Sequence, residues 1–435
     1  MVLSIVFRAL LRVLTTTRAM VLVLATVSVQ STLSKMKRSL IFILSLCLAV
    51  VTLTAGYNGK KVRKNRTLPA WSEGYLDIHT ISTGRGECLL LILPDGTSIV
   101  VDAGEFSREG KKHKNVAQRP NAQTRPTKAF GDYIRHFNPY DAVDYFNLSH
   151  FHMDHMGNME PEYTKSAEGD YLLTGVMALY HQVPFREVID RAYGAYDSLK
   201  VKAMSTKVLE EYKKFLNYHV AKGEMKASQF KLGAVNQFAL KHNAAAYPNF
   251  RIENVCSNGC VWKDGKAKDV YAGIRDKIRE NAASCGFVVR YGKFDFLTAG
   301  DIGDYNDLEY YVADAVGQVE AAKAHHHLSP HSMCQKSMEV LRPQTVVATS
   351  FYVREIQPDK SKFGYMAELG ADLFCTSVGE PLLEQYAAEY KYCDATSGHI
   401  VIRVAPGGDS YMVYTLDDTD SKYRVKNIAG PFKCK

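Results

Sequence analysis

The hydrophobic pattern in the first part of the chain predicts a group of strands. Residues 75–82 alternate apolar and polar positions, 86–93 form a largely apolar run, and 97–104 follow a tight Pro-Asp-Gly turn. Residues 127–138 have the pattern of a helix, and the apolar stretch 142–150 predicts a further buried strand. This part of the chain is therefore expected to form a sheet, with a helix between its third and fourth strands.

A second group of strands begins after residue 280. Residues 283–301 predict two strands joined by a Tyr-Gly-Lys turn. Residues 336–351 predict a helix that stops at a proline before a buried strand, and 399–416 predict a final hairpin. Strands in two clusters, each followed by helices, are typical of two sheets packed face to face with helices outside them. We predict an α/β (α+β) protein with the architecture of a four-layered αββα sandwich.

The section between these two groups has a different character. Residues 169–180 again resemble a strand, but 208–223 place apolar residues at helical spacing with Glu and Lys between them. We predict a helical insertion at about 160–250, set into a single domain that spans residues 70–435.

The positive net charge is concentrated at the N-terminus. The chain carries a formal net charge of +8 with 54 basic side chains, but eleven of these precede the first acidic residue, Glu73. The remainder is slightly acidic, whereas binding to long nucleic acid depends on a basic track that neutralises phosphates. The charge distribution therefore argues against long nucleic acid as a partner.

The N-terminal segment has the features of a targeting signal. Residues 36–56 contain the basic pair Lys37–Arg38, an apolar run and a small-residue exit at Thr54-Ala55-Gly56. We predict that residues 1–56 are a signal or targeting segment, with Met36 as the preferred translation start. An uncleaved membrane anchor and a mitochondrial transit peptide remain as alternatives. The prediction implies a secreted, periplasmic or cell-surface bacterial protein, which contacts a membrane only through this segment if it is not cleaved.

A dense cluster of histidines follows the strand predicted at 142–150. His150, His152, Asp154 and His155 lie within six positions. In an extended segment the side chains of His150 and His152 lie on the same face of the strand. The chain then turns, so that Asp154 and His155 face a second position next to the first. Imidazole and carboxylate ligands favour zinc, with manganese or iron as alternatives. The pattern predicts two adjacent divalent metal ions, against the alternative of a histidine-rich surface loop.

Two later features are weaker when taken alone. Asp301 ends an apolar strand, where an aspartate commonly caps a turn, and His325 to His327 form a triple histidine of the kind often found in solvent. A two-metal site, however, needs a bridging carboxylate and a closing ligand. The order of the cluster at 150–155, Asp301 and the triple histidine along the chain is therefore a stronger indication of a metal site than any one of them alone.

That order resembles the metallo-β-lactamase superfamily, whose hallmark is the motif His-x-His-x-Asp-His. Within it, the chain is most similar to the branch that includes the hydrolase-like C-terminal domain of bacterial DNA-uptake (competence) proteins and the phosphorylcholine esterases. Residues 76–104 resemble the opening of that branch, 280–302 its strand pair that ends in Gly-Asp, and 323–332 its motif Lys-x-x-His-His-Gly-Ser.

The resemblance implies a role for each matching residue. His150 and His152 would hold metal one, Asp154 and His155 metal two, Asp301 would bridge the metals, and His327 would complete metal two. Asp154 and His326 would take part in catalysis, with His326 facing the substrate. Asp102 would orient a ligand histidine through its free ring nitrogen, and Ser329 would assist His326.

The function implied is that of an exported binuclear hydrolase, most simply a phosphodiesterase or other phosphoesterase that uses a hydroxide shared by two zinc ions. The substrate would be a small-molecule, lipid or nucleotide phosphoester. The alternatives are a β-lactam or lactone hydrolase on the same site, and a surface binding protein that retained the fold without activity.

The sequence departs from the family pattern in several places. Arg85 and Glu87 stand for a glutamine and an aspartate, and Leu328 replaces a glycine, which predicts a narrower pocket. A third protein ligand for metal one has no clear match. His181 and His219 are candidates for it, although a structural role is the simpler interpretation of both.

Overall fold

The computed structural model describes residues 62–106, 116–202, 204–351 and 357–435. The targeting segment predicted at 1–56 lies outside these residues. The described residues fall in one compact unit, Lys61–Lys435. Within this part of the chain, no helix combines the length and the apolar character needed to span a membrane.

The first sheet has nine strands and two halves of different character. Its strands from β18 to β3 are antiparallel neighbours, and those from β3 to β6 are parallel. In order across the sheet they are β18 (Val425–Lys433), β17 (Ser410–Leu416), β16 (His399–Val404), β1 (Leu76–Thr80), β2 (Leu89–Ile92), β3 (Ser98–Val101), β4 (Val143–Leu148), β5 (Phe185–Asp190) and β6 (Lys226–Gln229).

The second sheet also has nine strands, with a parallel half from β15 to β11 and an antiparallel half from β11 to β9. Its order is β15 (Cys393–Ala395), β14 (Asp372–Cys375), β13 (Thr345–Ala348), β12 (Ala321–Lys323), β11 (Phe294–Thr298), β10 (Gly286–Tyr291), β7 (Phe250–Ser257), β8 (Cys260–Lys263) and β9 (Lys266–Asp269).

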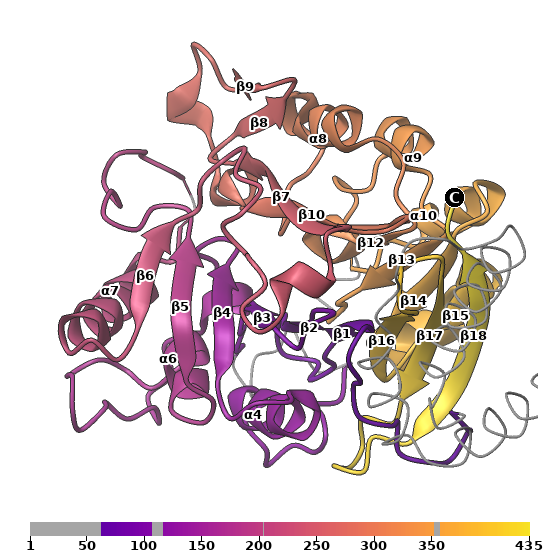
Figure 1. Cartoon of the computed structure of the whole chain (residues 1–435), viewed down its shortest axis with the longest axis horizontal. Coiled ribbons are helices and arrows are strands. Elements are labelled where there is room, and N and C mark those ends of the chain that lie inside the picture. Colours follow the sequence, from indigo (N-terminus) through magenta and orange to yellow (C-terminus); the bar gives the residue numbers. More distant parts are fainter. Residues whose placement is uncertain (1–61, 107–115, 203, 352–356) are drawn as a thin grey trace, which may run out of the picture. The chain divides into compact units, whose positions relative to one another are not determined.

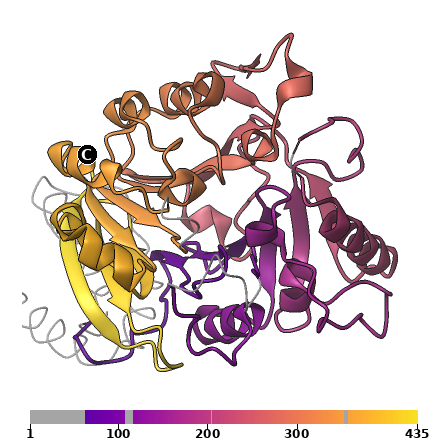
Figure 2. The same ribbon diagram turned by 180° about the vertical axis from the view of Figure 1, so that it is seen from behind.

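The two sheets pack face to face, and helices cover their outer faces (Figure 1; Figure 2). Apolar side chains from both sheets, such as Leu91, Ile402, Phe287 and Val347, form the core between them. The helices of the first sheet are α4 (Pro126–Phe137), α6 (Gly175–Tyr180) and α7 (Thr206–Ala221), and those of the second are α8 (Leu308–Val316), α9 (Gln335–Leu341) and α10 (Ser361–Glu368). The predicted four-layered αββα sandwich is confirmed.

Shorter helices connect these elements. They are α5 (Met153–Met156), α11 (Glu380–Gln385), α12 (Ala387–Tyr390) and the 3-10 turns η2 (Ala244–Ala246), η3 (Arg275–Lys277), η4 (Glu280–Ala283), η5 (Tyr305–Asp307) and η6 (His325–Leu328). Two of them, α5 and η6, carry residues of the predicted metal site.

Most predicted elements are confirmed, but the strand expected within 169–180 is wrong. Its second half, Gly175–Tyr180, forms α6, all of whose residues are buried, and no strand forms in its first half. A short apolar segment that is buried on every side has no period to distinguish a helix from a strand. The region 160–250 also contributes more than helices, because β5 and β6 extend the first sheet. The hairpin at 399–416 is followed by one more strand, β18.

Candidate metal centre

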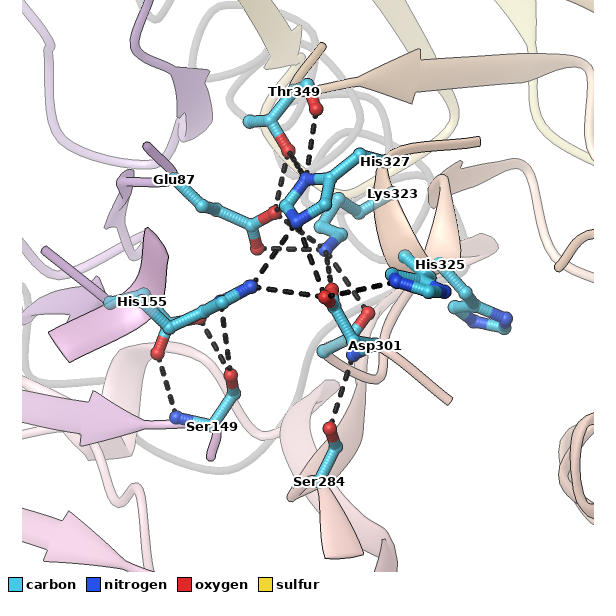
Figure 3. A network of polar contacts seen from close by, with 12 residues as sticks. Glu87, Ser149, His155, Ser284, Asp301, Lys323, His325, His327 and Thr349 are labelled. Atoms are coloured by element: carbon cyan, nitrogen blue, oxygen red, sulfur yellow. Dashed lines mark hydrogen bonds and ion pairs between the residues drawn. The ribbon is translucent and has the colours of Figure 1, made fainter. Parts of the chain in front are cut away.

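The predicted site residues come from loops at the carboxyl ends of neighbouring strands. Residues 149–156, including α5, follow β4 of the first sheet. Asp301 follows β11, and η6 follows β12, both in the second sheet. In layered α/β proteins the loops at this end of parallel strands are a common place for functional side chains. Here the loops of both sheets converge on Asp301 (Figure 3).

His150, His152 and Asp301 form the first group. One ligand atom of each lies within 4.8 Å of the others. The Nε2 atom of His150 is 3.1 Å from Nδ1 of His152 and 3.8 Å from a carboxylate oxygen of Asp301. His150 is fully buried, whereas His152 is half-buried.

His155, His327 and the same Asp301 form the second group, which also includes Glu87. The Nε2 atoms of His155 and His327 lie 3.2 Å apart, and each is 3.2 Å from Oδ2 of Asp301. Oδ2 of Asp154 lies 3.2 Å from Nε2 of His327. Asp301 thus belongs to both groups, and Asp154 stands beside the second.

Neighbouring oxygen atoms orient the histidine rings. Oδ2 of Asp102 lies 2.8 Å from Nδ1 of His155, and the backbone oxygen of Thr349 lies 3.0 Å from Nδ1 of His327. Both oxygens accept a hydrogen bond when the proton is on Nδ1, which directs the lone pair of each Nε2 toward Asp301. Asp102 thus lies against the ring of His155, on the side away from Asp301.

The arrangement of donors fits divalent metal ions. Two nitrogens bound to one tetrahedral zinc at about 2.1 Å each lie roughly 3.4 Å apart, close to the nitrogen–nitrogen distances of both groups. Oδ1 of Asp301 is buried, and the described part of the chain offers it no hydrogen-bond partner. Nζ of Lys323 lies 4.0 Å from this oxygen, too far for a hydrogen bond. Buried polar atoms are rarely left without a direct partner, so the oxygen is available to a metal ion.

Proton affinities differ between the two groups. Burial lowers the pKa of His150 well below its ordinary value. Burial acts in the same direction on His155 and His327, but Asp301 and the nearby carboxylates raise the pKa more, well above the ordinary value for His155 and to about 9 for His327. The second group therefore attracts positive charge, which protons supply when metal is absent.

A buried ion pair links the two sheets beside this cluster. Nζ of Lys323 donates to both oxygens of Glu87, at 2.7 and 2.8 Å, and to the backbone oxygen of Gly300 at 3.2 Å. Thr349 donates to Glu87 at 2.5 Å. Since both oxygens of Glu87 are engaged, Asp154 is the carboxylate available to the second group in addition to the shared Asp301. Sequence reasoning assigned no role to Lys323, although a lone lysine in the apolar segment 321–324 was a usable signal.

His326 occupies the more open side of the cluster, with a side chain 27% exposed. Its Nδ1 lies 2.9 Å from Oγ of Ser329, and its Nε2 lies 3.2 Å from the amide of Asn281 and 4.0 Å from Asp301. Ser329 is itself buried. The structure thus brings His326 and Ser329 together and places His326 beside Asp301.

Leu328 does not narrow the pocket, so that prediction is wrong. Its side chain is fully buried in the core under the helices of the second sheet. The direction follows from the backbone, because His326, His327 and Leu328 all have positive φ angles of 45°, 54° and 60°. Three successive left-handed residues turn the histidines toward Asp301 and the leucine toward the core.

The two candidates for a third ligand of metal one lie elsewhere. His181 and His219 each contact the hydroxyl of Tyr171 at 2.7 Å, and Nδ1 of His219 lies 2.6 Å from Glu224. Tyr171 belongs to the core under the helices of the first sheet. The structure brings neither histidine into the two groups around Asp301.

The chain is thus an αββα sandwich with a buried histidine–carboxylate cluster suited to metal ions. No protein-family model matches it. No curated protein matches it either.

Solved structures show weak likeness. The chain is similar to Tm1679, a metal-dependent hydrolase of the β-lactamase superfamily, with 12% identity and a TM-score of 0.35 over 76% of this chain and 99% of that one. It is also similar to the short form of human tRNase Z, with 10% identity and a TM-score of 0.30 over 62% and 90% of the two chains. At these values the fold class rests on the sheet order and layers of the chain itself.

Proposed function

We propose that the chain is a metal-dependent hydrolase of the metallo-β-lactamase superfamily that cleaves phosphoesters. One observation carries the proposal: Asp301 belongs to both groups of ligand atoms, and its second oxygen is buried without a hydrogen-bond partner among the described residues. A carboxylate in this position is suited to bridge two ions. Zinc fits the imidazole and carboxylate donors best, with manganese or iron as alternatives.

The residues around the ions would divide the work. Bound metal ions activate water and polarise a substrate oxygen in such centres. His150 and His152 would hold one ion, and Asp154, His155 and His327 the other. Burial lowers the pKa of His326, so its ring would be neutral. It would exchange its contact with Asn281 for a hydrogen bond from Nε2 to a substrate oxygen, while Ser329 holds its second nitrogen.

Local charge favours an anionic substrate. Glu87 is balanced by Lys323, so two divalent ions outweigh the charges of Asp154 and Asp301. Together with the acidic balance after residue 73, these charges favour a small-molecule, lipid or nucleotide phosphoester over long nucleic acid.

The test combines metal analysis with a substrate panel. Purified protein is expected to contain two zinc ions per chain and to hydrolyse chromogenic phosphodiesters or phosphomonoesters. Hydrolysis of nitrocefin or a lactone with inert phosphoesters would favour the alternative hydrolase. Metal binding without turnover of any ester would favour a binding protein, and a chain that binds no metal would contradict the proposal.

Export of the protein is a separate part of the proposal. Residues 1–56 have the composition of a targeting signal. N-terminal sequencing of the protein recovered from the periplasm or the medium is expected to begin close to residue 57. A full-length chain retained in the cytoplasm would contradict export without affecting the proposed chemistry.

A further inference from the structure

Phe151, the residue between His150 and His152, is held on both sides of its backbone. Its N–H donates to Oε1 of Glu280 at 2.8 Å, and its carbonyl oxygen accepts from the N–H of Ser205 at 3.0 Å. Its side chain is only 1% exposed. The contacts come from η4 and from the segment after β5, both distant in sequence, so the fold rather than the loop itself fixes this backbone.

A buried ion pair holds Glu280 in place. Nε and Nη2 of Arg191 donate to the two oxygens of Glu280 at 2.8 Å each, and the two side chains are 1% and 0% exposed. The guanidinium carbon of Arg191 also lies 4.3 Å from the centre of the Phe151 ring. Arg191 directly follows β5, so the pair connects the region 160–250 to the loop of the metal-site histidines.

The residue on the other side of His150 is anchored as well. Asp102 accepts from the N–H and the hydroxyl of Ser149, both at 2.7 Å, and the backbone oxygen of Ser149 accepts from the N–H of Cys285 at 2.8 Å. His150 therefore lies between two fixed peptide groups. Because ligand side chains need positions accurate to about half an ångström, the peptide of Phe151 sets the spacing of His150 and His152.

Stability of the fold is a poor explanation for this ion pair. Removing two charges from water costs about as much as their attraction returns, and apolar side chains of similar volume serve a core equally well. A charged acceptor, however, makes a stronger hydrogen bond to a backbone N–H than a neutral one does. An apolar replacement of the pair would lose the hydrogen bond to Glu280 from the Phe151 N–H, which lies between His150 and His152.

We propose that Glu280 and Arg191 are positioning residues that hold His150 and His152 in a metal-binding arrangement, and that the region 160–250 serves the centre through this contact. The consequence for metal affinity rests on the proposed function. The contact itself is testable without metal.

The experiment compares two buried ion pairs of the same geometry. Arg403 binds Asp77 through two hydrogen bonds of 2.8 and 2.6 Å, with side chains 10% and 0% exposed, and links β16 to β1. Asp77→Ala is the matched control for Glu280→Ala. Three quantities are measured in each protein: resistance to denaturant, zinc affinity by competition with a chelator, and the hydrogen-exchange rate of the Phe151 amide.

Both variants are expected to lose stability, but only Glu280→Ala should weaken zinc binding, by roughly 10- to 100-fold, and accelerate exchange at Phe151. The double variant E280Q/R191M should recover part of the affinity, because glutamine still offers an oxygen to Phe151 and no unpaired guanidinium remains. Equal zinc affinity and equal Phe151 exchange in Glu280→Ala and Asp77→Ala would overturn the proposal.

Two further outcomes keep the test decisive. If Glu280→Ala does not fold, Glu280→Asp replaces it, since its carboxylate is one methylene further from Phe151 but keeps its charge for Arg191. The same differences in affinity and exchange are then expected. If the unmodified protein binds no zinc, the proposed function fails, and the exchange rate at Phe151 alone decides the positioning role.

Discussion

The two halves of the metal centre are built in different ways. The half from the first sheet places His150, His152, Asp154 and His155 in one loop, and no residue from 149 to 156 has a positive φ angle. The half from the second sheet takes its side chains from two loops and depends on three successive left-handed residues at 326–328. In the first half, side chains from other parts of the chain, such as Asp102 and Glu280, fix the backbone of the loop. In the second half, the left-handed backbone is intrinsically unfavourable, and the surrounding structure maintains it.

Asp301 is where the halves meet, so its replacement should have the largest effect. Asp301→Asn is expected to lower turnover at least roughly 1,000-fold and to reduce the content of both metals. His152→Ala should remove only the metal of the first group, and His327→Ala only that of the second. Metal analysis and turnover of the three variants give the answer.

Asp304→Asn is the control for these variants, because Asp304 follows in the same loop and its side chain is 40% exposed. It should retain both metals and full turnover. Two metal ions bound to Asp301→Asn would mean that the two ligand groups do not share this carboxylate.

The same contrast explains what the sequence could predict. His150 to His155 are recognisable because strand and turn geometry bring residues of one short segment together. His327 and Asp301 were identified only through their order in a family pattern, since no local rule joins two loops separated by 26 positions. Glu280 and Arg191 were missed because neither stands out in its own segment and their pairing joins positions 89 residues apart, whereas Lys323 stood out in an apolar segment but its partner could not be predicted. The sheets were predictable from apolar runs, whereas α6 was not, because its residues are buried on every side.

Variants of the ion pair between Glu87 and Lys323 would measure how much this pair contributes to holding the two sheets together beside the metal centre. Lys323→Met would leave the fully buried carboxylate of Glu87 without its cation, and breaking such a pair costs about 3–5 kcal/mol. The double variant E87Q/K323M should regain most of that stability. Denaturant unfolding of the metal-free proteins measures both effects.

Lys165→Met is the control for the ion pair, since Lys165 and Asp170 are paired on the surface with exposures of 54% and 78%. It should leave stability unchanged. A single Lys323→Met variant as stable as the unmodified chain would show that the pair does not hold the two sheets together.

Loading with metal should depend on pH in the second ligand group only, which contains His155 and His327. The pKa of His327 is raised to about 9 in the metal-free chain, and that of His155 is raised well above its ordinary value. A raised histidine pKa means that the bound proton stabilises the folded state fully below about pH 6.5, and that this contribution is lost as the pH rises toward about 9. Zinc must displace these protons, whereas His150, whose pKa is lowered, holds none at neutral pH.

Equilibrium dialysis should therefore find about one tightly bound zinc ion per chain at pH 6 and two at pH 9. His327→Ala should remove the ion that is gained at high pH, and His152→Ala the one that is present throughout. Two ions bound equally well at pH 6 would contradict this difference between the two ligand groups.

The smallest effect concerns the left-handed backbone of the second half. Leu328 is fully buried with φ of 60°, and Leu341, at the end of α9, is equally buried in a helix. Truncation to alanine should cost about 3 kcal/mol at either position. Glycine tolerates a left-handed backbone that alanine resists by about 1 kcal/mol, but it weakens a helix by a similar amount. Leu328→Gly should therefore be more stable than Leu328→Ala, and Leu341→Gly less stable than Leu341→Ala, in denaturant unfolding. If alanine were the better replacement at both positions, the turn at 326–328 would lose its left-handed backbone when the leucine is removed. The packing of Leu328 would then maintain this turn, rather than the convergence of the histidines on Asp301.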